Sequence, residues 1–438
     1  MDEMEYPDAE GAAFQAEVER HFRWNFVVNV LDGAFFWLGL SFAAPSTILP
    51  LYVSHLTDSR ILIGLVAAIV GSGWYLPQLL TVHYVERLPV KKTLVINVGF
   101  FTERLPFVLM AVSVFLFAGR APTVALWAFF ITLVWRAVGA GVVAIAWQDM
   151  VAKVIPVHYR GRLLGIANFL GTALGLVGSS LAAAILDRYP FPINFGFCMS
   201  LTALFILASW VALSLTREPP LKSQKPTLSL REYGRYLPIV LRKDRNFAAY
   251  LATRIMAVLG HMGIGFVTVY AVQRWHLTDS QAGLYTAVFL GGQAVANLLA
   301  GALADRYGHK LVLEISVCLS ALSMLIAVMA PSPIWMYTVF ATIGAVVAAD
   351  LLSSIMLPME FASVEERPTY MGLANTVPGL FSAIAPLIGG WIASCGGYGT
   401  LFLAATVLSA LSWVILHWLV QEPRNATLGD AERLRDMP

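Results

Sequence analysis

Long apolar runs separated by short polar breaks repeat along the whole chain. A helix needs about 20 apolar residues to cross a bilayer core roughly 30 Å thick. The runs reach this length and lack the alternation of a barrel strand, so helices are the way to satisfy their backbone hydrogen bonds in lipid. The pattern predicts twelve transmembrane helices, at residues 26–53, 61–81, 93–118, 124–147, 163–186, 193–216, 247–271, 282–302, 311–330, 334–358, 370–394 and 400–420.

Composition agrees with a protein embedded in a lipid bilayer. Hydrophobic residues make up 58% of the chain and charged residues 13%, about half the charged share of an ordinary soluble domain. The first 24 residues are acidic rather than basic, unlike a cleavable signal peptide. We therefore expect residues 1–24 to form a cytoplasmic tail that leads into the first helix.

Basic residues set the expected orientation in the membrane. With the amino terminus inside, 22 of the 29 lysines and arginines fall in cytoplasmic segments, as the positive-inside rule requires. Both termini are expected in the cytoplasm, with the protein in the plasma membrane, such as a bacterial inner membrane. Because topology accounts for the basic residues, we expect no nucleic-acid partner. The three cysteines suggest neither a disulfide framework nor a metal site, and we expect no cofactor and a monomer.

An internal repeat divides the chain into two halves. The pentapeptide HLTDS occurs at 55–59 and again at 276–280, each time in an outer turn where its hydroxyl residues can cap the next helix. Further along, QLLTVHYVERLPVKK (78–92) aligns with NLLAGALADRYGHKL (297–311), and Arg217-Glu218-Pro219 matches Gln421-Glu422-Pro423. A duplicated six-helix unit explains these matches.

The duplication also predicts the domain organisation. A long basic linker separates six spans from six. The expected parts are an acidic tail at 1–24, an amino-terminal bundle at 25–216, a cytoplasmic linker at 217–246, a carboxy-terminal bundle at 247–420 and a cytoplasmic tail at 421–438.

The string GALADRYGHK (301–310) resembles the cytoplasmic loop signature of the major facilitator superfamily. The resemblance implies an all-α membrane fold of twelve helices in two pseudo-symmetric six-helix bundles, which alternate access to a midplane site. It also implies a cytoplasmic gate, in which an acid caps a helix terminus and basic residues add ion pairs. The first-half copy keeps the acidic and basic spacing but lacks both glycines. The implied gate residues are Gly301, Asp305, Arg306, Gly308 and Lys310, with Glu86, Arg87 and Lys91 in the first half.

Six ionisable residues lie well inside the predicted spans. Such residues are costly in lipid and usually functional. Three acids and three bases balance one another, which favours pairing within the bundles. They are Asp32, Glu103, Arg104, Arg136, Arg254 and Asp350.

A candidate proton site lies on the first and fourth helices. Arg136, followed by Gly139 and Gly141, resembles a second signature of the family, which is associated with proton coupling. Asp32 facing Arg136 would then carry the proton, and a purely structural Asp32–Arg136 ion pair is the alternative. Glu103 is a further proton-coupling candidate, with structural pairing to Arg104 as its alternative.

Candidate substrate contacts follow from the helices that line the central cavity in the family, which are the first, fourth, seventh and tenth. Asn29 and Phe36 share a helical stripe with Asp32, and His261 shares one with Arg254. Asp350 lies on the tenth helix. These five residues, Asn29, Phe36, Arg254, His261 and Asp350, are the candidate substrate-contacting set.

These features favour a secondary transporter that moves a small organic solute. The leading hypothesis is proton-coupled export of amphipathic compounds. One alternative is an importer or facilitator for a polar metabolite such as a sugar or organic acid, and another is a non-transporting assembly or sensor protein on the same fold. We expect no enzyme, because the sequence shows neither a phosphate-binding loop with Gly-Lys-Ser/Thr nor a nucleophile elbow.

Overall fold

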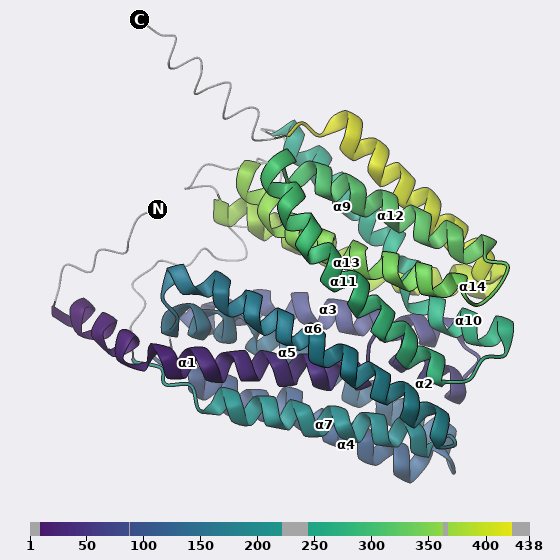
Figure 1. Cartoon of the computed structure of the whole chain (residues 1–438), viewed down its shortest axis with the longest axis horizontal. Helices are drawn as coiled ribbons and strands as arrows, with labels where there is room; N and C mark the ends of the chain where they lie inside the picture. The colour runs from purple at the N-terminus through teal and green to yellow at the C-terminus, as the bar shows by residue number, and fades with distance from the viewer. Residues whose placement is uncertain (1–8, 87, 221–243, 362–366, 423–438) are drawn as a thin grey trace, which may run out of the picture. The chain divides into compact units, whose positions relative to one another are not determined.

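A computed structural model describes residues 9–86, 88–220, 244–361 and 367–422, and every regular element in these ranges is helical (Figure 1). The chain forms two compact units that do not follow sequence order. Unit 1 contains residues 1–43 and 73–227, and unit 2 contains residues 44–72 and 228–438. Residues 44–72 therefore belong to the first repeat by sequence but to unit 2 by packing.

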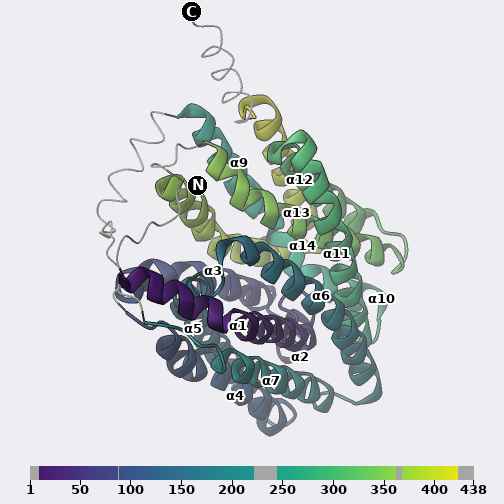
Figure 2. The same ribbon diagram turned by 60° about the vertical axis from the view of Figure 1, so that its left-hand side comes forward.

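Unit 1 is built around its first helix, which packs against the last two helices of the unit. Figures 1 and 2 show this helix and its neighbours α6 and α7 side by side. The helices are α1 (Ala9–Phe42), the part of α3 (Arg60–Glu86) from Gly73 onward, η1 (Leu94–Val98), η2 (Phe100–Arg104), α4 (Leu105–Ser113), η3 (Val114–Ala118), α5 (Pro122–Val154), α6 (Val157–Arg188) and α7 (Ile193–Ser214).

Unit 2 repeats this arrangement, because the first helix after the linker, α9, packs against the long final helix, α14. Its elements are α2 (Ile48–Leu56), the beginning of α3, α9 (Arg245–Gly260), η4 (His261–Phe266), α10 (Val267–Trp275), α11 (Ser280–Tyr307), α12 (His309–Met329), α13 (Trp335–Phe361) and α14 (Arg367–Leu419).

Each of the twelve predicted spans overlaps a helix of the structure, although several extend past its ends. Within the described residues, 10 helical stretches are long and apolar enough to cross a membrane. One of these, Tyr370–Leu419, is 50 residues long and contains a non-helical residue, Gly397, so it holds two spans. The apolar stretch Arg60–Trp74 at the start of α3 is shorter and accounts for the remaining span.

The first predicted span, 26–53, is not one continuous helix. α1 ends at Phe42, and α2 begins only at Ile48. Pro45 explains the break, because proline has no backbone N–H to donate and it disfavours the helical conformation of the residue before it. The change from unit 1 to unit 2 occurs at Ala43–Ala44, so the proline break coincides with the point where the chain changes units.

The duplication is visible as the same hydrogen-bonded clamp in both units. In unit 1, Asn25 Oδ1 accepts from the backbone N–H of Arg217 at 2.8 Å, and Asn25 Nδ2 donates to the Arg217 carbonyl at 2.9 Å. In unit 2, Asn246 makes the same two bonds with Gln421, at 2.7 and 3.0 Å. Each clamp ties the first helix of its unit to the chain that follows the last helix.

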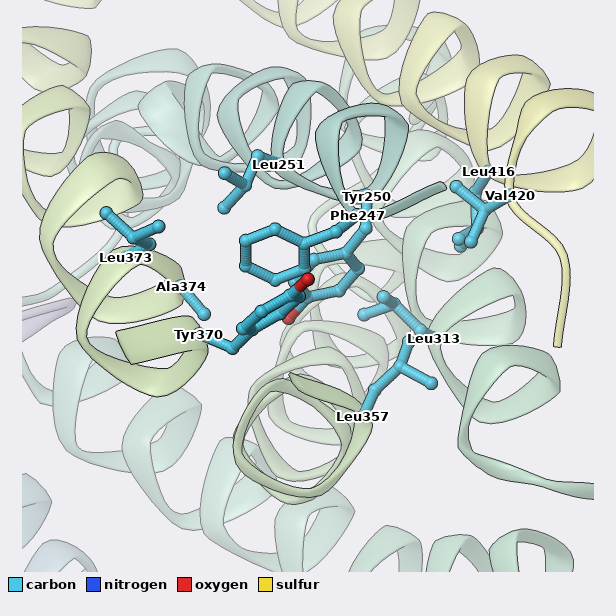
Figure 3. Close-up of a cluster of buried hydrophobic side chains, with 10 residues drawn as sticks. All are labelled: Phe247, Tyr250, Leu251, Leu313, Leu357, Tyr370, Leu373, Ala374, Leu416 and Val420. Carbon is cyan, nitrogen blue, oxygen red and sulfur yellow. The ribbon is translucent and has the colours of Figure 1, made fainter. Parts of the chain in front are cut away.

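Unit 2 has an aromatic core where α9, α12, α13 and α14 meet. Phe247 and Tyr250 of α9 stack with ring centroids 5.9 Å apart, and Phe247 lies 4.4 Å from the ring of Tyr370. Figure 3 shows these rings surrounded by aliphatic side chains from the four helices. Because aromatic rings bury large apolar areas in specific geometries, this cluster fixes how α9 packs against its neighbours.

Close helix packing in unit 1 depends on glycines of α5. A Cβ atom built at Gly139 would lie 2.0 Å from the carbonyl oxygen of Thr102, and one built at Gly141 would lie 2.3 Å from the carbonyl oxygen of Gly73. Both neighbours are backbone atoms, which cannot move aside as a flexible side chain could. These two glycines therefore let α5 approach η2 and α3 at backbone contact.

The Gly139→Ala variant should lower the melting temperature of the purified protein, because overpacking costs about 1–3 kcal/mol and the obstructing atom here is backbone. The matched control is Gly165→Ala in α6 of the same unit, where an added Cβ meets no atom within 4 Å. That change should leave the melting temperature unchanged or raise it, since alanine favours a helix by about 1 kcal/mol over glycine. Equal melting temperatures for the two variants would contradict the packing argument.

Candidate functional site

The ionisable side chains inside the spans form one group in each unit. Unit 1 holds the larger group, on α1, η2 and α5, and unit 2 holds a pair on α9 and α13. The unit 1 group is Asp32, Glu103, Arg104 and Arg136, and the unit 2 pair is Arg254 and Asp350.

Asp32 is a buried carboxylate held between helices of unit 1. Its side chain is on α1, and the Ser209 hydroxyl of α7 donates to Asp32 Oδ1 at 2.6 Å. The Arg104 guanidinium and the Trp147 indole also interact with this carboxylate. Asp32 is 6% exposed. The packing of α1 against α7 thus supplies the donor that holds the carboxylate in place.

Glu103 and Arg104 contact each other directly at the end of η2. Both side chains are buried. The π-helical turn, which is frequent at functional sites, places the two consecutive residues within the unit rather than on its outside. Arg104 Nη1 also lies near Gly99, 3.5 Å from where a Cβ of that residue would be.

The structure differs from the sequence analysis in the partner that it gives Asp32. Arg104, not Arg136, interacts with this carboxylate. The physical reason is the position of η2, which packs against both α5 and α7 and brings the Arg104 side chain close to Asp32. Among the described residues, no carboxylate lies within 4.0 Å of the Arg136 nitrogens, and its guanidinium lies over the Phe107 ring at 4.9 Å.

Asn29 and Phe36 occupy different surroundings on α1. The amide of Asn29 donates to the Asn25 carbonyl at 2.8 Å and to the Thr216 hydroxyl at 3.2 Å. Asn29 therefore extends the hydrogen-bonded clamp between Asn25 and Arg217. Phe36 packs against the buried cluster that contains Phe107, the same ring that faces Arg136.

Arg254 and Asp350 form a two-pronged ion pair in unit 2. Arg254 Nη2 donates to Asp350 Oδ2 at 3.1 Å, and Nη1 contacts Oδ1 of the same carboxylate. His261 and Tyr250 interact electrostatically with both members of the pair. Three of the five candidate substrate contacts thus lie together, and α9, η4 and α13 supply them.

His261 also lies at a helix interruption beside a small cavity of unit 2. The α-helix α9 ends at Gly260, and His261 begins the 3₁₀ turn η4. The cavity has a volume of about 170 Å³ and is lined by His261, Met262, Ile264, Gly265, Pro386 and by residues of the 44–72 segment, namely Pro45, Ser46, Ala67 and Val70. Among the described residues, no group of three His, Cys, Asp or Glu side chains could hold a metal ion.

The predicted gate residue Lys91 lies in a cluster of charges in unit 1. Lys91 Nζ pairs with Asp149 Oδ2 at 3.2 Å. Glu218, which follows α7, accepts from the backbone N–H groups of Lys91 and Lys92 at 3.0 and 2.6 Å and from Lys153 Nζ at 2.9 Å. Because free N–H groups and the helix dipole attract an anion, Glu218 caps the chain that enters η1.

The equivalent contacts in unit 2 involve Gly308, Lys310 and Glu422. Gly308 has φ of +92°, a conformation that L side chains rarely adopt, and a Cβ there would lie 2.5 Å from Glu422 Oε2. Glu422 Oε2 accepts from the Lys310 N–H at 3.3 Å, and Lys310 Nζ pairs with Glu314 at 3.3 Å. Glu218 and Glu422 thus play the same part in the two units.

The other predicted gate residues are less engaged or not described. A Cβ at Gly301 would meet no atom within 4 Å, and Arg306 is exposed and lies over the Tyr307 ring at 5.2 Å. The Glu86 and Asp305 side chains and Arg87 lie outside the described residues. Sequence reasoning did not assign Glu218 and Glu422 a role, although the match of Arg217-Glu218-Pro219 with Gln421-Glu422-Pro423 was the signal that could have identified them.

Comparison with known proteins shows which families and folds this chain is similar to. The family model described as Major Facilitator Superfamily matches residues 250–435. A solved structure of a D-xylose-proton symporter superposes with a TM-score of 0.65 at 18% sequence identity, covering 91% of this chain and 98% of that one.

Curated relatives also match in sequence, including the following two. The MFS-type transporter YfkF of Bacillus subtilis is 25% identical over 292 residues, which are 66% of this chain and 72% of the relative. The niacin transporter NiaP of Acinetobacter baylyi is 24% identical over 153 residues, which are 35% of each chain. The chain thus aligns with about a third of the length of this transporter. The carboxy-terminal part of the chain thus matches the major facilitator superfamily in sequence, and the described helices have a fold similar to that of a solved proton symporter.

Proposed function

We propose that this protein is a proton-coupled secondary transporter of a small organic solute and that Asp32 is its proton site. The observation that carries the proposal is a buried carboxylate inside a span, fixed by the Ser209 hydroxyl and close to the Arg104 guanidinium. A carboxylate in such a place exchanges a proton when its access to water or its neighbours change. Arg104 supplies the fixed positive charge that favours release of the proton.

Neither Glu103 nor Arg136 carries the proton in this proposal. Glu103 contacts Arg104 and orients the guanidinium that faces Asp32, so it acts on the proton site through Arg104. Arg136 interacts electrostatically with Arg104, and Asp32 interacts with Arg104. The proton therefore remains on a single carboxylate.

The direction of transport has two candidates. Export of amphipathic compounds is the first, in line with the apolar and aromatic side chains around the charged groups. The second is uptake of an organic acid, which would need a free cation inside the spans. Arg254 does not supply that cation, because Asp350 occupies its guanidinium. The second candidate is favoured instead by Arg136, which contacts no carboxylate among the described residues.

Residues 44–72 are proposed to be the outer gate of an alternating-access cycle. Within unit 2 they contact the second repeat at several points. The Thr47 and Thr286 hydroxyls are 2.5 Å apart, and His55 Nε2 lies 2.9 Å from Asp279 Oδ1. His55 and Asp279 belong to the two copies of HLTDS, so the repeated outer turns contact each other. Opening toward the outside requires these contacts to separate.

The inner ends of the helices are proposed to form the cytoplasmic gate. Lys91, Gly308 and Lys310 are fixed by Glu218 and Glu422, so each gate segment is tied to the chain that leaves its own unit. Gly301, Asp305, Arg306, Glu86 and Arg87 complete the proposed gate. A plasma-membrane location with both termini in the cytoplasm, a monomeric state and the bundle boundaries 25–216 and 247–420 belong to the same proposal.

Replacing Asp32 by Asn should abolish stimulation of transport by a pH gradient in proteoliposomes, because an amide cannot exchange the proton. The assay would compare uptake and efflux of a transported solute with and without the gradient. Asp187→Asn is the matched control, since Asp187 is exposed near the end of α6 and the change should leave the stimulation intact. Gradient-dependent transport by Asp32→Asn at the wild-type level would contradict the proton-site assignment.

A Thr47→Cys/Thr286→Cys variant should form a disulfide under mild oxidation, because the two hydroxyl oxygens are 2.5 Å apart. The background would lack Cys198, Cys318 and Cys395, which are free. Transport by this variant should fall at least about tenfold on oxidation and return on reduction, since the bond prevents residues 44–72 from separating. The two single-cysteine variants should be insensitive to oxidant. Full transport by the cross-linked protein would argue against an outer gate at this segment.

A further inference from the structure

The three arginines inside the spans differ in their partners. Arg104 contacts Glu103, and Arg254 contacts Asp350. Arg136 is 7% exposed, and no carboxylate within the described part of the chain pairs with it. Its Nε atom is enclosed without a hydrogen-bond partner among these described residues, as is that of Arg104, so the missing carboxylate is what distinguishes Arg136. An unpaired guanidinium in such a place is costly, which points to an anion that completes its coordination.

The charge around Arg136 also favours an anion. The Arg104 guanidinium interacts electrostatically with Arg136, and the two positive charges repel each other. Glu103 is engaged by Arg104, and Asp32 by Ser209 and Arg104. When Asp32 carries the proton that the proposed function assigns to it, the four residues sum to a charge of +1. One bound anion then restores neutrality.

The side chains packed around Arg136 include aromatic rings. The Phe107 ring lies 4.9 Å from the Arg136 guanidinium carbon, and Phe36 of α1 packs against the cluster of Phe107, Ala203 and Ile206. A ligand with a carboxylate and an aromatic ring suits both features. The carboxylate can bond two guanidinium nitrogens in parallel, and the ring can stack against a phenylalanine.

The backbone beneath Arg136 is held in position. Gly139, three residues further along α5, packs directly on the Thr102 carbonyl of η2, and Ala137 packs on Gly73 of α3. Phe107 is buried and comes from α4, which also packs against α5. This packing fixes the guanidinium and the ring relative to each other, so a ligand that binds both does not have to order them.

From these contacts we infer that Arg136 and Phe107 form a binding site in unit 1 for an aromatic carboxylate. The inference rests on the proposed function, because it names the solute class that such a transporter would carry. Arg136 binds the carboxylate, while Phe107 and Phe36 bind the ring. Arg254 has no part in this site, because Asp350 occupies it.

The test measures binding to the purified full-length protein in detergent, without any ion gradient. Benzoate is the probe and benzamide, which has the same ring without the charge, is the matched comparison ligand. Wild-type protein should bind benzoate saturably and at least about tenfold more tightly than benzamide. Arg136→Gln should weaken benzoate binding at least about tenfold and benzamide binding little. Arg120→Gln, the same change at an exposed position of the same unit, should bind both ligands as the wild type does.

Two further variants keep the test decisive if Arg136→Gln does not fold. Arg136→Lys retains the positive charge and should bind benzoate within several-fold of the wild type. Phe107→Leu should weaken benzoate binding while affecting acetate binding little. The inference is overturned if benzoate shows no saturable binding, if benzamide binds as tightly as benzoate, or if a folded Arg136→Gln variant keeps wild-type affinity.

Failure of the proposed function can be told apart from failure of this site. If Asp32→Asn transports with the wild-type response to a pH gradient while benzoate binding still depends on Arg136, the proton coupling is wrong and the anion site stands. If the pH-gradient response depends on Asp32 while benzoate binding is insensitive to Arg136, the coupling stands and the anion site is wrong.

Discussion

A charged group in the hydrocarbon region of a membrane has no water to solvate it, so its solvation must come from the protein. This constraint accounts for much of how the two units are organised. In unit 2 it is met by a direct pair, Arg254 with Asp350, between α9 and α13. In unit 1 it is met by a group in which Glu103 contacts Arg104 and Ser209 binds Asp32. Arg136 lies over the face of the Phe107 ring and meets no carboxylate among the described residues. The helices are tied together at these points, because separating them would leave a buried charge unpaired.

The two units preserve their duplication at the ends and have lost it in the middle. The asparagine clamps at Asn25 and Asn246 make equivalent bonds, and Glu218 and Glu422 cap equivalent helix entries. These contacts involve backbone groups, which any sequence supplies, so the architecture can keep them while other side chains change. Halfway along these helices, by contrast, α1 of unit 1 carries an acid, Asp32, and α9 of unit 2 carries a base, Arg254. The two units therefore hold their buried charges differently, unit 1 in a larger group and unit 2 in a single direct pair.

Breaks in the helices determine which parts of the chain can act separately. The proline break after Phe42 sends residues 44–72 into unit 2, and α3 returns the chain to unit 1 within a single helix. A second interruption, at His261–Phe266, faces the cavity that this segment lines. Non-helical backbone at membrane depth is tolerated only where protein or a cavity satisfies its polar groups. The breaks therefore occur where the segment 44–72 packs against the second repeat.

The sequence by itself determined the helical class, the twelve spans, the duplication and the identity of the intramembrane charges. These follow from hydrophobic run length and self-similarity, which are local properties. It also placed Asp32 and Arg254 on definite helix faces through the 3.6-residue period. Only the tertiary structure decided that Arg104 rather than Arg136 interacts electrostatically with Asp32, that His55 contacts Asp279, and that residues 44–72 pack in unit 2. Periodicity specifies the direction in which a side chain leaves its own helix. The partner that it meets depends on how distant helices pack, and glycine contacts and helix breaks set that packing.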